Sequence, residues 1–186
     1  MSTTDILNDA RAHMEKTVKA LAHEFSTVRT GRASGAVLDD IKIDYYGTPT
    51  PISQIAGIKS PEPHMLVIEP WDKTALKAIE HAIMASDLGI TPSNDGMLIR
   101  LPFPQLTEER RKELVKQCKH YAEEARVGVR NVRRDANTKL TRAEKDAEIS
   151  EDDLRRAEAE TQKITDAHIQ LIDEALKRKE AEVMEV

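Results

Sequence analysis

Residues 107–142 read TEERRKELVKQCKHYAEEARVGVRNVRRDANTKLTR. The apolar side chains of this stretch recur at spacings of three and four, which predicts one long helix with a buried stripe. The stripe consists of Leu114, Cys118, Ala122, Ala125, Val129, Val132, Ala136 and Leu140. If the helix runs to about Lys145 it is roughly 55–60 Å long. Only other long helices could cover a stripe of that length.

The charged residues of the same stretch are distributed unevenly. Residues 107–142 hold eleven Lys and Arg against six Asp and Glu, although the whole chain carries a formal net charge of -5. Six of the cations are expected on one face of the helix, called here the cationic face: Lys112, Lys116, Lys119, Arg126, Arg130 and Arg134. The uncharged Asn137 is expected on the same face. Arg133 lies near the border with the apolar stripe. Positive charge placed so locally indicates one polyanionic partner bound through one surface.

A solvated surface is the ordinary explanation for a charged helix face. Two features favour a binding surface here. From Arg126 to Lys139, five cations accompany a single anion, Asp135. Arginine predominates among them, and its planar guanidinium makes bidentate phosphate contacts and stacks on bases. The pattern therefore favours nucleic acid as the partner.

Two further segments have long-helix patterns. Residues 3–29 place apolar side chains at coiled-coil spacing behind a capping box of Ser2 and Asp5. Their seam is Leu7, Met14, Leu21 and Val28, with Val18 and Phe25 between them. A second capping box, at 150–153, precedes another seam of Leu154, Ala157, Ile164, Leu171, Ala175 and Leu176. Three seams with short links predict a three-helix bundle.

Between the first two helices the sequence changes to a mixed pattern. Strands are expected at 41–45, 55–59, 64–69 and 97–101, and a helix at 74–88 that stops at Gly89. Turn residues at 47–51 and 93–96 separate them. The predicted fold class is α+β, a bundle domain of residues 1–30 and 104–186 with a small mixed α/β domain, residues 31–103, inserted between helices 1 and 2.

The chain is expected to cross between these domains twice. The first crossing, at 30–35, contains Gly31, Arg32, Ser34 and Gly35, and the second, at 102–104, contains Pro102 and Pro104. Glycines on one side and prolines on the other permit a hinge with few directions of motion. A fixed joint is the alternative.

Residues with catalytic chemistry do not cluster in the sequence. There is no Gly-x-x-x-x-Gly-Lys-Ser/Thr loop, and the six histidines are scattered. Cys118 lies in the apolar stripe, where a buried structural thiol is expected. We therefore expect a binding protein with no catalytic residue, metal or cofactor, rather than an enzyme. The lack of a membrane-length apolar run, of an export signal and of a cysteine pair favours a cytoplasmic protein.

Six sequence motifs resemble those of the bacterial ribosome recycling factor family. They are RTGRAS at 29–34, YYGTPTP at 45–51, MASDLG at 84–89, LTEERRK at 106–112, EARVGVRNVRRDAN at 124–137 and ISEDD at 149–153. The resemblance covers the whole chain in order. It implies an elongated three-helix bundle with an inserted α/β domain, L-shaped and similar to transfer RNA.

The resemblance also implies a function. Members of the family, with elongation factor G and GTP, separate post-termination 70S ribosomes into subunits so that messenger RNA is released. Their bundle binds ribosomal RNA of the large subunit, and elongation factor G pushes the inserted domain. By motif, the implied RNA contacts are Arg110, Arg130 and above all Arg133, with four neighbours: Arg126, Asn131, Arg134 and Asn137. A monomer without membrane contact is expected.

Two departures from the family pattern concern flexibility. Gly128 stands in mid-helix where alanine is common, and glycine there costs roughly 0.5–1 kcal/mol of helix stability. Gly35 and Ala36 follow where many members have a proline.

The competing interpretations are a structural or chaperone-like coiled-coil protein, which would form oligomers, and an enzyme with an atypical site in the α/β domain.

Overall fold

The computed structural model describes residues 1–185, which form two compact units. Unit 1 is Met1–Arg29 together with the chain from Glu108 onward, and unit 2 is Thr30–Thr107. The chain therefore passes between the units at 29/30 and at 107/108. The second crossing comes later in the chain than the border at 103/104 expected from the sequence.

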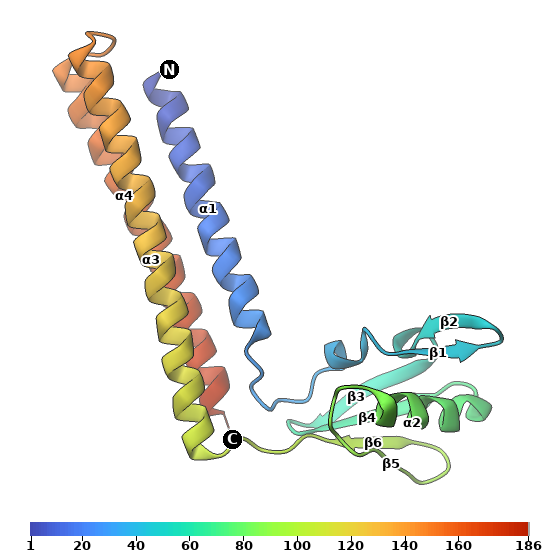
Figure 1. The fold of residues 1–186 in the computed structure, drawn as a ribbon. Helices are drawn as coiled ribbons and strands as arrows, with labels where there is room; N and C mark the ends of the chain where they lie inside the picture. Colours follow the sequence, from blue (N-terminus) through green and yellow to red (C-terminus); the bar gives the residue numbers. More distant parts are fainter. Residues whose placement is uncertain (186) are drawn as a thin grey trace. The chain divides into compact units, whose positions relative to one another are not determined.

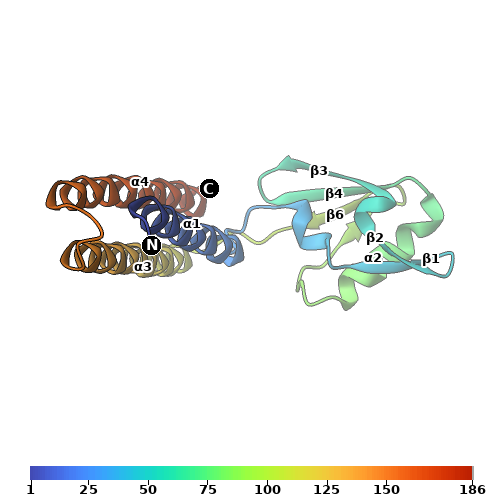
Figure 2. The same ribbon diagram turned by 90° about the horizontal axis from the view of Figure 1, so that it is seen from above.

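Unit 1 contains three helices that run alongside one another in both views (Figures 1 and 2): α1 (Thr3–Thr27), α3 (Glu108–Lys145) and α4 (Glu151–Met184). The two capping boxes form as the sequence predicts. The Ser2 and Ser150 hydroxyls each accept a hydrogen bond from the backbone N–H three residues later, and the Asp5 and Asp153 carboxylates each accept one from the backbone N–H of that serine. These contacts satisfy backbone N–H groups that have no partner inside the helix.

The short connection between α3 and α4 supplies hydrogen-bond donors to carbonyls in the last turn of α3. The Glu148 N–H donates to the Ala143 carbonyl and the Ala147 N–H donates to Glu144, both at 2.9 Å. This is the Schellman pattern, and it places Ala147 in the left-handed region with φ 58°. Ser150 then caps α4, so the two long helices are joined by a few residues.

The buried stripe of α3 matches the sequence prediction, except that Val132 is only half-buried. Two seam predictions were wrong. In α4, Leu171 is 47% exposed and Ile172 is buried in its place; in α1, Leu7 is half-buried and Ile6 is buried. Both seams follow a three-four spacing one residue away from the expected leucine, because the helix repeat of 3.6 residues drifts from a strict seven-residue count.

Polar side chains occupy part of the α4 seam. Thr161, Thr165 and His168 are buried, and each bonds the carbonyl four residues earlier, at 2.8, 2.8 and 2.7 Å respectively. These local bonds satisfy their polar atoms without a partner from another helix. Because these residues are polar, the apolar pattern of the helix does not include them.

Unit 2 contains two antiparallel sheets and one helix. A hairpin joins β1 (Lys42–Tyr45) to β2 (Thr48–Pro51). The second sheet has the order β3-β4-β6-β5, with the strands β3 (Ala56–Glu62), β4 (Met65–Pro70), β5 (Ser93–Asn94) and β6 (Ile99–Pro102). The helix α2 (Leu76–Ala85) lies beside this sheet (Figures 1 and 2). The α+β class predicted from the sequence is confirmed.

The core of unit 2 combines β4, β6 and α2. Ile68, Ile79 and Ile99 are fully buried in it, together with Leu66 and Ile83. Alternation along β4 and β6 supplies one apolar face, and the three-four spacing of α2 supplies another. Short 3₁₀ turns at Gly35–Leu38, Ile52–Gln54 and Lys73–Ala75 complete the unit.

Three local predictions in unit 2 need correction. The segment expected as a turn at 47–51 contains strand β2, and only Tyr46 and Gly47, with φ 50° and 82°, make the turn. Part of the turn expected at 93–96 is the short strand β5. The helix expected to reach Leu88 ends at Ala85, because the Ser86 hydroxyl and N–H both bond the Ile83 carbonyl.

Candidate nucleic-acid interface

The neighbours of α3 divide its surface into three sectors. Gly128 faces α1, because a Cβ built on it would lie 3.3 Å from Cγ2 of Thr17. Arg126 and Arg133 reach α4, where they bond Asp173 and Gln162. The remaining sector carries the rest of the cationic face, in which Lys112, Lys116, Lys119 and Arg134 are exposed and Arg130 is half-buried. This sector presents several cations at helical spacing to solvent.

Arg126 is neutralised by carboxylates within the bundle. Its Nε and Nη2 donate to Oδ1 of Asp173 at 2.9 and 2.7 Å, and its Nη1 donates to Glu123 at 3.1 Å. Partial burial alone would lower the pKa of Arg126, but the hydrogen bonds to Asp173 and Glu123 outweigh it and raise the pKa. The side chain is 20% exposed. Arg126 is therefore a link between α3 and α4.

Arg130 shares one of these carboxylates but remains accessible. Its Nη1 lies 3.3 Å from Oε1 of Glu123, and its side chain is 41% exposed. The hydrogen bond from Arg126, followed by the charge of Arg130, lowers the pKa of Glu123, so this carboxylate stays ionised between the two guanidinium groups. One carboxylate between two arginines leaves part of the charge of Arg130 available to an anion.

Arg133 has an uncharged partner on α4. Its Nη1 donates to Oε1 of Gln162 at 3.2 Å, and Nε2 of Gln162 donates to Asp166 at 2.8 Å. The side chain is half-buried, at the border between the cationic face and the apolar stripe. An amide carbonyl carries no net charge, so it orients the guanidinium without neutralising it as a carboxylate would.

The other predicted contact residues differ in their surroundings. Arg110, near the start of α3, pairs with Glu113 at 2.9 Å and is 57% exposed. Asn131 and Arg134 are exposed. Asn137 is half-buried, and its Oδ1 is buried without a hydrogen-bond partner among the described residues. The structure thus brings Arg130, Arg133 and Arg134 onto neighbouring turns of α3, while Arg110 stands several turns away.

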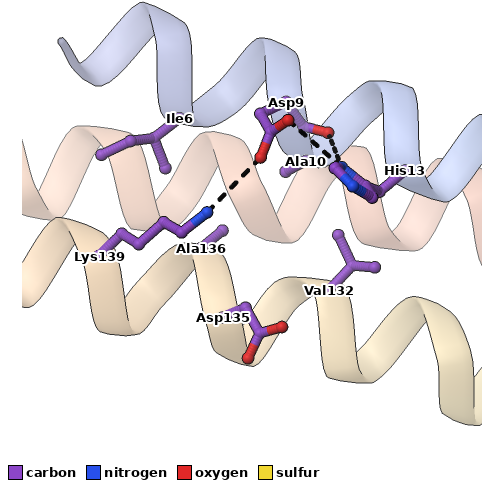
Figure 3. Close-up of a pocket in the computed structure, with 8 residues that line it drawn as sticks. All are labelled: Ile6, Asp9, Ala10, His13, Val132, Asp135, Ala136 and Lys139. Carbon is purple, nitrogen blue, oxygen red and sulfur yellow. Dashed lines mark hydrogen bonds and ion pairs between the residues drawn. The ribbon is translucent and has the colours of Figure 1, made fainter. Parts of the chain in front are cut away.

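A groove between α1 and α3 does not fit a polyanion. Its cavity of about 100 Å³ is lined by Asp9 and His13 from α1 and by Asp135 and Lys139 from α3, and the apolar side chains Ile6, Ala10, Val132 and Ala136 complete the lining (Figure 3). Lys139 is paired with Asp9 at 3.5 Å across the groove. Carboxylates on both walls repel phosphate, so the groove lies outside the candidate interface.

The residues predicted to form a hinge belong to the folded body of unit 2. Nδ1 of His64 donates to the Gly31 carbonyl at 3.0 Å, the Ala33 N–H donates to Pro63 at 2.7 Å, and the Phe103 N–H donates to His64 at 2.6 Å. Ser34 caps the 3₁₀ turn that begins at Gly35, and Arg32 lies two residues before this cap. Pro102 ends β6, and the Pro104 carbonyl lies 3.5 Å from a Cβ built on Gly31. Both predicted links are thus held by one turn, at Pro63 and His64.

Other kinds of site are not evident in the described part of the chain. Within residues 1–185, no group of three or more His, Cys, Asp or Glu side chains could hold a metal ion. None of the helices in that range has the length and apolar character that a membrane span requires. Cys118 is fully buried, and burial raises the pKa of its thiol, which makes it a poor nucleophile.

Two residues of α4 that the sequence of α3 does not indicate also shape the interface. Gln162 and Asp173 decide which arginines of α3 keep their charge. Both were predicted only to lie on a helix with a three-four seam. Their alignment with Arg133 and Arg126 depends on the register between two helices, and a single sequence carries no local signal for that register.

The architecture is that of α+β proteins in which a small sheet domain interrupts a helical bundle. The sequence profile described as "Ribosome recycling factor" matches residues 21–184. The ribosome-recycling factors of Nitratidesulfovibrio vulgaris and Rubrobacter xylanophilus are 54% and 56% identical over 186 residues, and the matches cover 100% of each chain. The chain belongs to the ribosome recycling factor family.

Solved structures agree with this assignment. The solution structure of a ribosome recycling factor matches 100% of this chain and 99% of its own, with 42% identity and a TM-score of 0.75. Another, with 46% identity, full coverage of both chains and a TM-score of 0.64, belongs to models of the T. thermophilus ribosome recycling factor and E. coli elongation factor G bound to the E. coli post-termination complex.

Proposed function

We propose that this protein is a translation factor that separates post-termination ribosomes into subunits, together with elongation factor G and GTP, and so frees the ribosome from messenger RNA. The observation that carries the proposal is the match to ribosome-recycling factors over the full length of both chains. One structural relative is described in a post-termination complex with elongation factor G. No catalytic chemistry is assigned to the chain itself, and the GTPase supplies the free energy.

Unit 1 binds ribosomal RNA of the large subunit through α3. Arg133 is the principal contact, because its side chain is oriented by an uncharged partner and keeps its charge. Arg130, about one turn before Arg133, and the adjacent Arg134 extend the contact, and Arg110, Asn131 and Asn137 lie on the same helix. Arg126 joins α3 to α4 through Asp173 and takes no direct part in the contact.

Unit 2 receives the action of elongation factor G. Unit 2 has its own core and is joined to unit 1 only at 29/30 and 107/108. The segments 31–35 and 102–104 move with it, since both are hydrogen-bonded to the turn at Pro63 and His64. A hinge therefore lies at the two crossings, and its motion drives unit 1 against contacts between the ribosomal subunits.

Splitting of post-termination ribosomes tests this function directly. Light scattering of 70S complexes with elongation factor G and GTP should fall when the wild-type protein is added and should stay constant when either the GTPase or GTP is left out. A protein that forms oligomers and leaves 70S complexes intact would instead support the coiled-coil alternative. Size exclusion with light scattering on the same preparation reports the oligomeric state, for which we expect a monomer.

A further inference from the structure

Two arginines of α3 reach across to α4 from equivalent positions but meet different partners. Arg126 and Arg133 are seven residues apart, so they occupy nearly the same angular position on the helix. Arg126 meets the carboxylate of Asp173 at 2.7 Å, and Arg133 meets the amide of Gln162 at 3.2 Å. The Arg126–Asp173 pair has no net charge, whereas the Arg133–Gln162 pair has a net charge of +1.

The Gln162 amide is itself held by a second contact. Its Nε2 donates to Oδ1 of Asp166, one turn later on α4, at 2.8 Å. This bond directs the opposite end of the amide, Oε1, toward Arg133. Asp166 therefore orients the partner of Arg133 through the amide of Gln162.

An arginine fixed before binding loses less conformational freedom when it contacts phosphate. A long side chain that is free in solution must be ordered on association, and that ordering weakens binding. A carboxylate could also hold the side chain, as Asp173 holds Arg126, but it would cancel the charge that attracts phosphate. A neutral acceptor combines order with charge.

We propose that Gln162 is a positioning residue for RNA binding, which holds Arg133 in its contact conformation while leaving its charge uncompensated. Asp166 fixes the amide that does so. This inference rests on the proposed function, since it assigns Arg133 to a phosphate of large-subunit RNA.

The chain offers a matched control on the same helix. Gln170 donates to Glu174, one turn later, at 3.2 Å. This pair repeats the Gln162–Asp166 arrangement on α4, and among the described residues no arginine bonds Gln170. Gln162 and Gln170 are both exposed, so substitution of either should leave the fold intact.

The test compares Gln162→Met and Gln162→Glu with Gln170→Met and Gln170→Glu. Binding to purified large ribosomal subunits is measured by pelleting at graded KCl. Gln162→Met removes the acceptor but no charge, so affinity should fall about twofold to tenfold with an unchanged salt slope. Gln162→Glu keeps the acceptor and neutralises Arg133, so the slope of log K against log salt should become shallower by roughly 0.9. Both Gln170 variants should bind like the wild type.

Arg133→Ala separates this inference from the proposed function. In that background Gln162→Met should cause no further loss of affinity, because its partner is gone. If Arg133→Ala weakens binding while both Gln162 variants match their Gln170 counterparts, the positioning role is refuted and the RNA contact stands. If Arg133→Ala itself leaves binding unchanged, the RNA contact fails, and the positioning role fails with it.

Discussion

Nε and Nη2 of Arg126 donate to the same oxygen of Asp173, at 2.9 and 2.7 Å, and so join α3 to α4. The same guanidinium bonds Glu123 on its own helix. Arg126 belongs to the cationic face by its position in the sequence, yet its charge is neutralised by carboxylates inside unit 1. The net charge of a helix face therefore overstates what the face offers to RNA.

Asp173→Asn should weaken unit 1 without weakening RNA binding. The substitution removes the charge of a partly exposed ion pair, so the free energy of unfolding should fall by about 0.5–1 kcal/mol in urea denaturation. Affinity for large subunits should stay the same or rise, because Arg126 regains charge. Asp146→Asn is the control, since Asp146 pairs loosely with Arg142 at 3.8 Å and should change stability little. Equal effects of the two substitutions would contradict a link between α3 and α4.

Gly128→Ala should stabilise unit 1 by less than helix propensity predicts. Alanine gains about 1 kcal/mol over glycine in a helix interior. Its Cβ, however, would lie 3.3 Å from Cγ2 of Thr17 on α1, so that methyl group must shift. The gain should approach the full value in a Thr17→Ala background, where the methyl group is absent. Thermal unfolding of the four variants measures the coupling, and strictly additive effects would show that α1 does not limit the substitution.

Gly31→Ala should destabilise unit 2 more than Gly89→Ala does. Both glycines have positive φ, at 75° and 70°, so alanine costs about 1–2 kcal/mol at either position. Only Gly31 is crowded, because its Cβ would lie 3.1 Å from Cγ of Leu106, and Gly89 has nothing within 4 Å. Hydrogen exchange of the β4 amides reports the stability of unit 2. The extra destabilisation by Gly31→Ala, relative to Gly89→Ala, should shrink in a Leu106→Ala background. If it persists there, it comes from the backbone at Gly31 and not from the contact with Leu106.

Cys118 should react with thiol reagents only after unfolding. Burial raises the pKa of its thiol, so the folded protein holds less reactive thiolate at a given pH than the unfolded chain. The contribution of Cys118 to stability is therefore complete below the ordinary value of 9.0 and is lost as the pH rises through the higher folded-state value. A coloured disulfide reagent at pH 8 should give no signal before denaturant is added, and Cys118→Ala serves as the blank. Immediate reaction of the native protein would contradict the buried position.

The parts of the fold that depend on local sequence were predictable. The capping boxes at Ser2 and Ser150 need only residues three positions apart, and the stripe of α3 needs only its own periodicity. Strand β2 was missed because Pro49 and Pro51 are typical of turns. β2 pairs with β1 alone in the described sheet, so it is an edge strand. An edge strand tolerates proline because the missing N–H can fall on its unpaired side.

The candidate interface was predictable only in part. The sequence of α3 identifies its arginines, and the family resemblance ranks Arg133 first among them. Neither distinguishes the surroundings of Arg126 from those of Arg133, since both positions face the same way on α3. The difference comes from Asp173 and Gln162, whose alignment with α3 is set by packing between the helices.

The affinity of Arg133→Ala for purified large ribosomal subunits tests the central claim most directly. Arg155→Ala is the matched control, because Arg155 is an exposed arginine on α4 that pairs with Glu151 on its own helix. Across graded salt, Arg133→Ala should bind more weakly, with a slope of log K against log salt shallower by roughly 0.9. Arg155→Ala should match the wild type, and circular dichroism should be the same for all three. If Arg133→Ala binds like Arg155→Ala at every salt concentration, α3 does not hold RNA through Arg133.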